Sequence, residues 1–328
     1  MRSNSLRHRL FGALVIPALF VLGACGGTAA GSGDSTASSS ASSAAAASAE
    51  PVTVTHAQGT ATIPATPRTV VVFDIGVLVT LDELGVPVAG VPQLDTLPDS
   101  LAEYRSDDYA KVGSLFEPDY EKVAALDPDL IIIAGRSSAA YPELSKISTT
   151  VDLTVDYENF LSSFRRRTEA LGTIFGKQDQ VRQRLDALET TVGEVAAKAQ
   201  GKGTGLVVLT TGGKLSAYGP GSRFGLVYDP LGVKPAADDL AKDSHGNAIS
   251  AEFLAKADPD LLYVVDRDSA IGESGKAAEQ VLDNELVNQT KAAKNDKIVY
   301  LDAFVWYIAP NGLSSVEAMV KAIGDSLS

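Results

Sequence analysis

Two arginines stand at matching places in an internal repeat. Residues 121–136 and 252–267 align without a gap; both stretches contain Asp-Pro-Asp-Leu, and they end in Arg136 and Arg267 respectively. A guanidinium is planar, stays charged at neutral pH and donates several hydrogen bonds in a fixed geometry, so it suits an oxygen-rich anion. The repeat therefore places an arginine at the same position in two related halves of the chain.

The elements predicted within the repeat position these arginines. In each copy a short helix (121–126 and 252–257) is ended by a proline, and a buried apolar strand (130–133 and 261–265) follows. Ligands of open α/β sheets bind beyond the carboxyl ends of the strands. The two arginines are therefore expected to face each other across a cleft between two α/β lobes.

A second repeated segment, Asp-x-Leu-Gly-Val, lies at 82–86 and 229–233. The apolar runs 70–73 and 206–209 that precede it are predicted to be buried strands. A helix is expected to follow each strand and to end at the repeated Leu-Gly-Val, where the glycine suits a C-terminal cap.

A long helix is predicted between the two halves, over residues 178 to about 200. Its apolar residues recur at helical spacing: Val181, Leu185, Leu188, Val192 and Val195. At 1.5 Å per residue it spans roughly 34 Å, which is enough to join two lobes stiffly. We therefore predict an N-terminal α/β lobe (51–176), an interlobe helix (177–201) and a C-terminal α/β lobe (202–328); a surface helix of one lobe is the alternative.

The N-terminus is predicted to direct export. A basic leader precedes an apolar run at 10–22 that is too short for an ordinary membrane-spanning helix. The run ends in Leu22-Gly-Ala-Cys25, which resembles the bacterial lipobox, so residues 1–24 are expected to be a lipoprotein signal peptide and Cys25 the acylated residue. A plain signal peptide with an incidental cysteine is the alternative. Residues 25–50, rich in Gly, Ala and Ser, are expected to form a flexible tether.

Composition excludes several classes of function. The 28 Lys and Arg against 41 Asp and Glu give a net charge of −13, which disfavours nonspecific binding to nucleic acid. One cysteine and three histidines leave no disulfide framework, CxxC metal site or polyhistidine site. The HExxH, GxSxG, GxxxxGK and GxGxxG motifs of common enzymes are absent from the folded part. An anionic ligand must therefore be held by a local cluster of basic residues.

Four motifs carry a resemblance to a known family: Gly219-Pro-Gly-Ser-Arg223-Phe-Gly225, His245-Gly-Asn247, Val264-Val-Asp-Arg267 and Trp306-Tyr307. With them, residues from about 52 to 328 resemble the class III substrate-binding proteins of bacterial ABC importers for ferric siderophores, haem and vitamin B12. The resemblance is strongest to the enterochelin-type branch, which binds catecholate siderophores. It implies an α/β fold of two Rossmann-like lobes joined by one long rigid helix.

The resemblance implies roles for residues at matching positions. Arg136, Arg223 and Arg267 would hold the anionic catecholate oxygens of the ligand. His245 and Tyr307 would bind ferric iron directly when the siderophore leaves part of its octahedron open. A loop histidine and a packed aromatic residue are the alternative reading of that pair.

Two acidic residues of the repeat imply a docking surface. In the family, a glutamate on each lobe contacts a basic pocket of one of two permease subunits, and Glu121 and Glu252 match these positions. Both are also expected at helix starts, where the helix dipole favours a carboxylate, so a structural capping role is the alternative.

The implied function is that of a lipid-anchored, monomeric receptor on the outer face of the cell membrane. It would capture a ferric catecholate siderophore and pass it to an ABC permease dimer with its ATPase, without an intrinsic cofactor, covalent chemistry or nucleic acid. A receptor for haem or a hydroxamate siderophore is one alternative. A siderophore-processing lipoprotein esterase is another.

Overall fold

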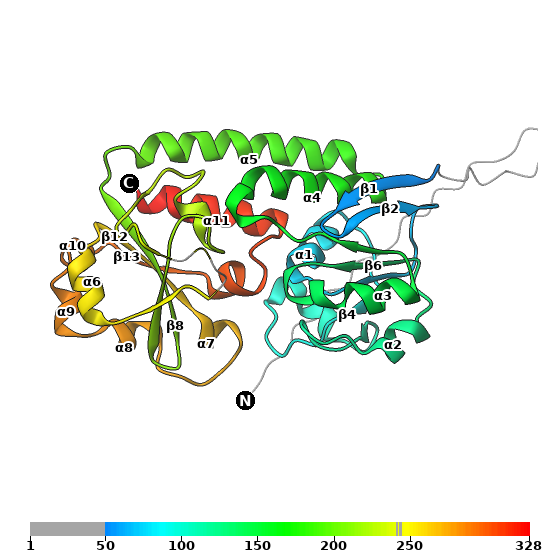
Figure 1. The fold of residues 1–328 in the computed structure, drawn as a ribbon, viewed down its shortest axis with the longest axis horizontal. Helices are drawn as coiled ribbons and strands as arrows, with labels where there is room; N and C mark the ends of the chain where they lie inside the picture. The colour runs from blue at the N-terminus through cyan, green and yellow to red at the C-terminus, as the bar shows by residue number, and fades with distance from the viewer. Residues whose placement is uncertain (1–49, 241, 243–244) are drawn as a thin grey trace, which may run out of the picture. The chain divides into compact units, whose positions relative to one another are not determined.

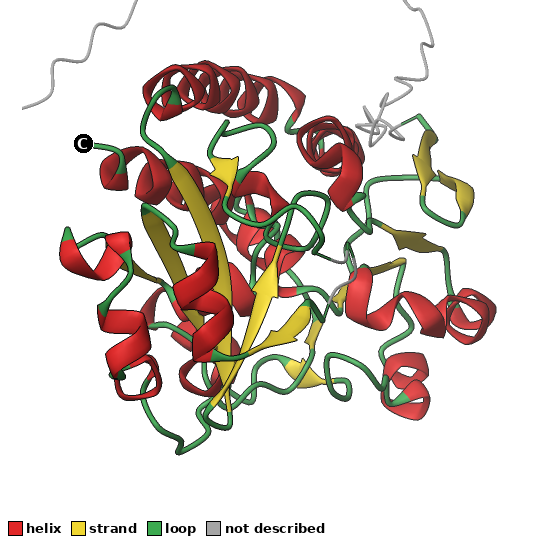
Figure 2. Ribbon diagram, turned by 60° about the vertical axis from the view of Figure 1, so that its left-hand side comes forward, coloured by secondary structure: helices red, strands yellow, loops and turns green. Residues whose placement is uncertain are grey.

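Two sheets carry the fold in the computed structural model, which describes residues 50–240, 242 and 245–328. The predicted signal peptide, the lipidation site at Cys25 and nearly all of the predicted tether lie outside the described residues. Figure 1 shows the arrangement of the labelled elements, and Figure 2 shows the strands flanked by helices. Among the described residues, no helix is long and apolar enough to cross a membrane.

The N-terminal sheet is parallel throughout, with strand order β5-β4-β3-β6-β7. Its strands are β3 (Val70–Val72), β4 (Gly90–Val91), β5 (Ala110–Lys111), β6 (Leu130–Ile133) and β7 (Thr150–Asp152). The helices of this part are α1 (Ile75–Glu83), α2 (Tyr120–Ala125), α3 (Tyr141–Ile147) and α4 (Phe160–Phe175). The side chains of β3 and β6 are fully buried, as their uninterrupted apolar runs predict.

The C-terminal sheet is mixed, with the order β11-β9-β8-β12-β13 and β10 beside β8. Its strands are β8 (Thr204–Thr211), β9 (Lys214–Tyr218), β10 (Lys234–Pro235), β11 (Asn247–Ile249), β12 (Leu261–Asp266) and β13 (Ile298–Leu301). The helices are α6 (Ala251–Ala257), α7 (Arg267–Ala270), α8 (Ala278–Leu282), α9 (Glu285–Asn288), α10 (Lys291–Lys294) and α11 (Leu313–Ser326). Strand β9 runs antiparallel to both of its neighbours, whereas β8, β12 and β13 are parallel.

The prediction of a helix between the strand at 206–209 and Gly232 is wrong. Strand β8 instead turns back into β9 through Gly212 and Gly213, whose φ angles are +53° and +74°. Two consecutive residues with positive φ give the tight turn that matches the twist of a hairpin, and glycine adopts this conformation without a steric cost. A 3₁₀ turn (Gly225–Val227) then precedes Gly232. The corresponding expectation for the first lobe is confirmed, because α1 ends just before Gly85, whose φ is +65°.

The long helix predicted over 178 to about 200 is confirmed as α5 (Gln178–Ala199). Its five predicted apolar residues are buried, and α5 contacts both α4 and α11. A hairpin of β1 (Val52–His56) and β2 (Gly59–Ile63), which the sequence did not indicate, contacts α4. The two-sheet α/β fold class is confirmed, while the exact lobe boundaries stay predictions.

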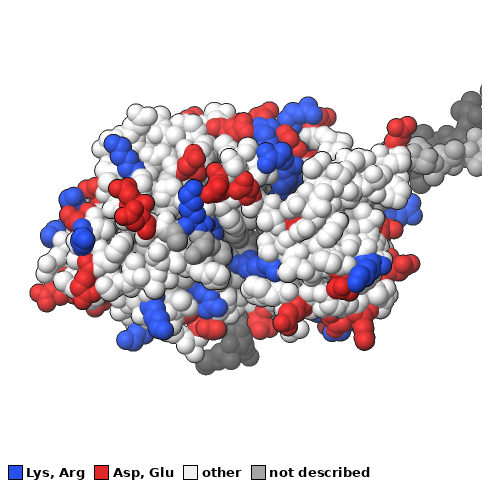
Figure 3. Space-filling view, in the orientation of Figure 1, with Lys and Arg blue, Asp and Glu red and all other residues white. Residues whose placement is uncertain are grey.

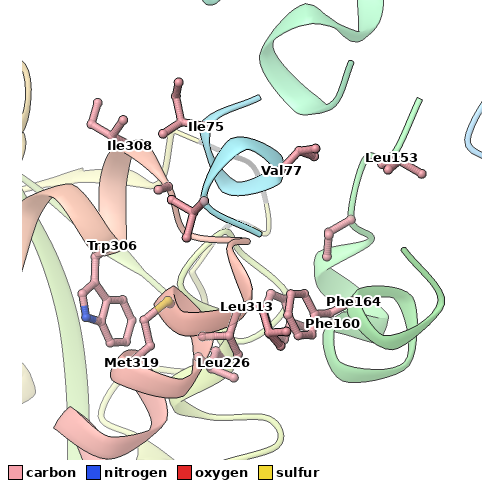
Figure 4. Packing of buried hydrophobic residues seen from close by; sticks show 14 of the residues in the cluster. Ile75, Val77, Leu153, Phe160, Phe164, Leu226, Trp306, Ile308, Leu313 and Met319 are labelled. Carbon is pink, nitrogen blue, oxygen red and sulfur yellow. The ribbon is translucent and has the colours of Figure 1, made fainter. Parts of the chain in front are cut away.

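Helices α1 and α11 pack closely against each other. A Cβ on Gly76 would lie 2.7 Å from the carbonyl carbon of Asn311, so only glycine fits at this crossing. The backbone N–H of Leu313 donates to Thr80 Oγ1 at 3.0 Å. Figure 4 shows the apolar cluster here, which joins residues of α1, α4 and α11 into one core. Close backbone contact and a shared core therefore fix α1 and α11 relative to each other.

Candidate ligand-binding site

A cavity of about 520 Å³ opens between the two sheets. Its wall includes Arg136 and Tyr157 from the N-terminal half and Arg223, Arg267 and Tyr307 from the C-terminal half. Figure 3 shows acidic side chains spread over this face of the molecule and basic side chains beside its hollow. The structure thus brings the three arginines predicted from the sequence to one cleft.

Arg136 reaches from the N-terminal sheet to the backbone of the C-terminal half. It lies in a 3₁₀ turn (Gly135–Ala140) directly after β6. Its Nη1 donates to the carbonyl of Ile308 at 3.2 Å, and its Nη2 donates to the carbonyl of Tyr307. Burial and the nearby positive charge of Arg223 lower the pKa of Arg136 from its ordinary value, although an arginine stays charged at neutral pH. The cleft therefore holds a desolvated positive charge at this position.

Arg223 follows the glycine-rich segment after β9. Its Nη2 donates to the carbonyl of Tyr307 at 3.0 Å, and its guanidinium lies over the rings of Tyr307 and Phe224. Its Nε is buried and has no hydrogen-bond partner among the described residues. A buried unpaired donor is costly, so this nitrogen has hydrogen-bonding capacity left for a ligand or water.

Arg267 begins α7 immediately after β12, the position that the repeat predicted. Its Nε donates to the phenol oxygen of Tyr307 at 3.0 Å, and its Nη1 donates to Thr211 Oγ1 at 3.2 Å. The carboxylates of Asp268 and Glu273 lie farther away, at 3.8 and 3.9 Å. Burial opposes the charge, but the bond to Tyr307 and these carboxylates raise the pKa of Arg267 overall. This guanidinium is thus firmly charged.

Tyr307 lies at the centre of the arginine cluster. The guanidinium carbons of Arg136, Arg223 and Arg267 lie 5.5, 4.5 and 5.8 Å from its ring centroid, within the range of cation–π attraction. Tyr307 belongs to a π-helical turn (Phe304–Ile308), a rare element that is frequent at functional sites. The last carbonyls of a helix have no partner within it, which leaves those of Tyr307 and Ile308 available to the arginines.

His245 lines the same cavity as Tyr307 and is exposed to solvent. Its carbonyl accepts a hydrogen bond from the phenol of Tyr218 at 2.9 Å. In the part of the chain that the structure describes, no group of three or more His, Cys, Asp or Glu side chains is placed to hold a metal ion. An iron site that used His245 and Tyr307 would need further ligands from the bound molecule itself.

Glu121 and Glu252 lie outside the cavity wall, each in the first turn of its helix, α2 and α6. Both side chains are exposed. Hydrogen bonds from Ser250 and from its own backbone N–H lower the pKa of Glu252. Their equivalent places on the two halves are compatible with docking and with helix capping alike.

Among the cavity-wall residues that were not predicted are Asp74, Asn311 and Phe116. Asp74 caps α1, accepting from Val77 N at 2.9 Å, and forms an ion pair with the buried Arg167 at 2.7 Å. Asn311 is only 8% exposed, and its Oδ1 has no hydrogen-bond partner in the described part of the chain. Phe116 projects from a loop of the N-terminal half. Of these, only Asp74 had a signal in the sequence, because it directly follows a predicted strand end.

Comparison with known proteins decides the family. The family model described as periplasmic binding protein matches residues 70–304, which is well over half of the chain. The chain belongs to the periplasmic binding protein family. This confirms the family predicted from the cleft arginines and the four motifs.

This periplasmic binding protein is similar to several characterised relatives. It is 41% identical to the petrobactin-binding protein YclQ of Bacillus subtilis over 97% of the chain and 98% of the relative. The crystal structure of that relative superposes with a TM-score of 0.81 at 43% identity, covering 85% of this chain and 99% of the other. The catecholate-siderophore-binding protein VctP of Vibrio cholerae gives 0.80 at 35% identity over 84% and 99%. The siderophore-binding protein BauB, solved with two acinetobactin molecules and ferric iron, gives 0.78 at 35% identity over 85% and 99%.

Proposed function

We propose that this protein is an extracytoplasmic receptor that binds a ferric catecholate-type siderophore in the cleft and delivers it to an ABC import permease. The observation that carries the proposal is the convergence of Arg136, Arg223 and Arg267, from both halves of the molecule, on one tyrosine. Relatives that are similar over nearly their whole length are named for binding petrobactin, catecholate siderophores or ferric acinetobactin. The proposed cargo therefore agrees with both the site and the family.

Charge complementarity explains why the ligand is an anionic iron complex. A ferric ion held by three doubly deprotonated catecholates has a net charge of three minus, which three guanidiniums can balance. A contact at 4 Å gives about 4 kcal/mol at an effective dielectric of 20, before the cost of desolvation is subtracted. This attraction is needed because the chain as a whole has a charge of −13. The cluster is thus the local counterpart to an acidic surface.

The cleft offers two further ligands to iron. A bis-catecholate leaves part of the ferric octahedron open, and the imidazole of His245 and the phenol oxygen of Tyr307 would complete it. Arg267 donates a hydrogen bond to this phenol oxygen at 3.0 Å. The iron enters as part of the cargo, so the receptor itself needs no resident cofactor and performs no covalent chemistry.

Delivery of the siderophore to the permease would involve groups outside the cleft. Acylated Cys25 would hold the protein on the outer face of the membrane through the tether at 25–50. Exposed Glu121 and Glu252, at equivalent places in the two halves, would each contact one subunit of the permease dimer that works with the ATPase. A monomeric receptor with two equivalent carboxylates matches a transporter with two-fold symmetry.

Fluorescence titration tests the proposed ligand class. Trp306, the single tryptophan, is 1% exposed and lies next to Tyr307 in the sequence, so it reports on the cleft. We expect tight quenching by ferric tris-catecholate and ferric bis-catecholate, and a charge-transfer change for the bis-catecholate alone. Iron-free ligands serve as controls. Binding of haemin or a ferric hydroxamate alone would overturn the catecholate assignment while leaving a receptor.

A further inference from the structure

Phe116 is the most exposed large hydrophobic residue of the described chain. Its side chain is 62% exposed, compared with 44% for Tyr300 and 40% for Tyr120. Unlike those two tyrosines, Phe116 lines the cleft that holds the three arginines. A phenyl ring in water is unfavourable, and one that is exposed in the wall of the cleft is available for an apolar contact with a ligand.

The loop that carries Phe116 is held in shape without the phenyl ring. Ser114 N donates to the carbonyl of Glu117 at 3.0 Å, and Ser114 Oγ accepts from the N–H groups of Phe116 and Glu117 at 3.2 and 3.0 Å. Gly113 forms a bridge to Pro118 with a φ of +115°, and a Cβ there would lie 2.4 Å from the carbonyl oxygen of Glu117. The backbone therefore fixes the tip of the loop, and the side chain of Phe116 is available to a ligand.

An aromatic ring restricts the chemistry of the ligand that it contacts. Its flat face and edge pair favourably with another aromatic ring, in offset or edge-to-face geometry. The arginines bind oxygen atoms and discriminate poorly between a catecholate and any other compact polyanion of equal charge. Phe116 supplies what the arginines lack, a contact that depends on the ligand being aromatic.

We infer that Phe116 is a specificity-determining residue that packs against a catecholate ring of the bound complex, so that the cleft selects aromatic over aliphatic ferric anions. The inference rests on the proposed function and adds the reason for the ligand class. Phe116 also precedes Tyr120 and Glu121 by only a few residues. A contact with the permease is therefore the rival role, and the experiment must separate the two.

The test compares Phe116→Ala, Phe116→Leu and Phe116→Trp in the full-length protein, with ferric bis-catecholate and ferric citrate as probes. We expect Phe116→Ala to weaken binding of the catecholate about tenfold. Phe116→Leu restores only part of this loss, because it returns apolar volume without an aromatic face, while Phe116→Trp binds like wild type. The affinity for ferric citrate stays unchanged in all three variants.

The matched control is Tyr300→Ala, which removes an exposed aromatic residue from a different cavity. Thermal unfolding checks that all variants are folded. Uptake of the ferric catecholate by cells is measured alongside binding. Unchanged catecholate affinity in Phe116→Ala would overturn the inference. If uptake is slower at unchanged affinity, Phe116 contacts the permease instead. An equal loss for ferric citrate would overturn it as well. A wild-type protein that binds no aromatic ferric complex would instead overturn the proposed function.

Discussion

Arginines in two regions of this protein are used in opposite ways. One set, the paired arginines, lies on helices and forms ion pairs with carboxylates: Arg165, Arg167 and Arg184. The other set, the cleft arginines, is Arg136, Arg223 and Arg267. Within the described chain, the hydrogen bonds of the cleft arginines go to carbonyl, phenol and hydroxyl oxygens. Arg165 alone contacts Glu169, Asp186 and Glu189 at 2.6–2.9 Å, and these acids raise its pKa. Of the cleft arginines, Arg267 alone forms ion pairs within the described chain, at 3.8 and 3.9 Å, whereas the paired arginines contact their carboxylates at 2.6–2.9 Å. The comparison teaches that the fold neutralises its structural cations more completely than those of the cleft.

The largest expected effect is on stability, at Arg167. Its side chain is 3% exposed and that of its partner Asp74 is 12% exposed, so Arg167→Leu leaves a desolvated carboxylate without its cation. Removal of one partner from a buried pair costs about 3–5 kcal/mol. Urea unfolding measures this loss. The double variant Arg167→Leu with Asp74→Asn, which keeps the helix cap, is expected to recover part of it. A loss below about 1 kcal/mol would show that this pair is not structural.

The next effect is on binding, at Arg136. Arg136→Ala removes one guanidinium from the cleft, and a hydrogen bond to a charged group contributes about 1.5–3 kcal/mol, so the dissociation constant for the ferric catecholate is expected to rise about 10- to 100-fold. The free energy of unfolding is expected to stay nearly unchanged, because the carbonyl of Tyr307 still accepts from Arg223. Arg165→Ala is the matched control and leaves affinity unchanged. Equal affinities for both variants would break the comparison.

A smaller effect is expected at Arg184 of α5, which connects this helix to α1 and α11. It donates to Glu83 of α1 at 2.6 Å and to Glu317 of α11 at 2.7 Å. The three side chains are partly exposed, so water screens the network and Arg184→Gln is expected to cost only about 1 kcal/mol of stability. Ligand affinity stays within about twofold. A large loss of affinity would show that the spacing of the cleft depends on this network.

The smallest effect concerns His56, whose burial disfavours the charged form of the imidazole. Burial lowers the pKa of His56, against the opposing attraction of Asp152. Below the unfolded value of about 6.5 the unfolded chain binds more protons than the folded one, so this contribution destabilises the protein as the pH falls and vanishes above that value.

Unfolding midpoints at about pH 5.5 and about pH 7.5 measure this effect on either side of the unfolded pKa. His56→Gln is expected to reduce the difference between the unfolding midpoints at the two pH values. An unchanged difference in His56→Gln would place the pH sensitivity elsewhere.

Much of the scaffold could be predicted because its signals are local. The uninterrupted apolar runs at β6 and β12 and the helical spacing of α5 depend on residues close together in the sequence. The repeat then placed Arg136 and Arg267 at equivalent strand ends, and both line the cleft. Where the pattern failed, before Gly232, two glycines determined a hairpin that the apolar periodicity did not show.

The rest of the site depends on contacts between distant segments. Asn311 lies in the cleft because its backbone crosses α1 at Gly76, and no property of residues 309–312 announces that crossing. Phe116 is distinguished by its exposure, which a sequence does not show. The acceptor of both Arg136 and Arg223 is a backbone carbonyl, which every residue possesses, so residue type could not single out Tyr307 for that role.

The carbonyls of the π-helical turn also bear on release of the cargo. Arg136 and Arg223 both donate to the carbonyl of Tyr307, and Arg136 donates in addition to that of Ile308. On the proposed function, a siderophore oxygen that accepts from Arg136 or from Arg223 Nη2 in place of such a carbonyl exchanges one acceptor for another, whereas the unpaired Arg223 Nε gains a new hydrogen bond. When the complex leaves, the guanidiniums return to the turn. These alternative acceptors in the turn limit the affinity for the siderophore and make its release easier. Both effects suit a receptor that must pass its ligand on.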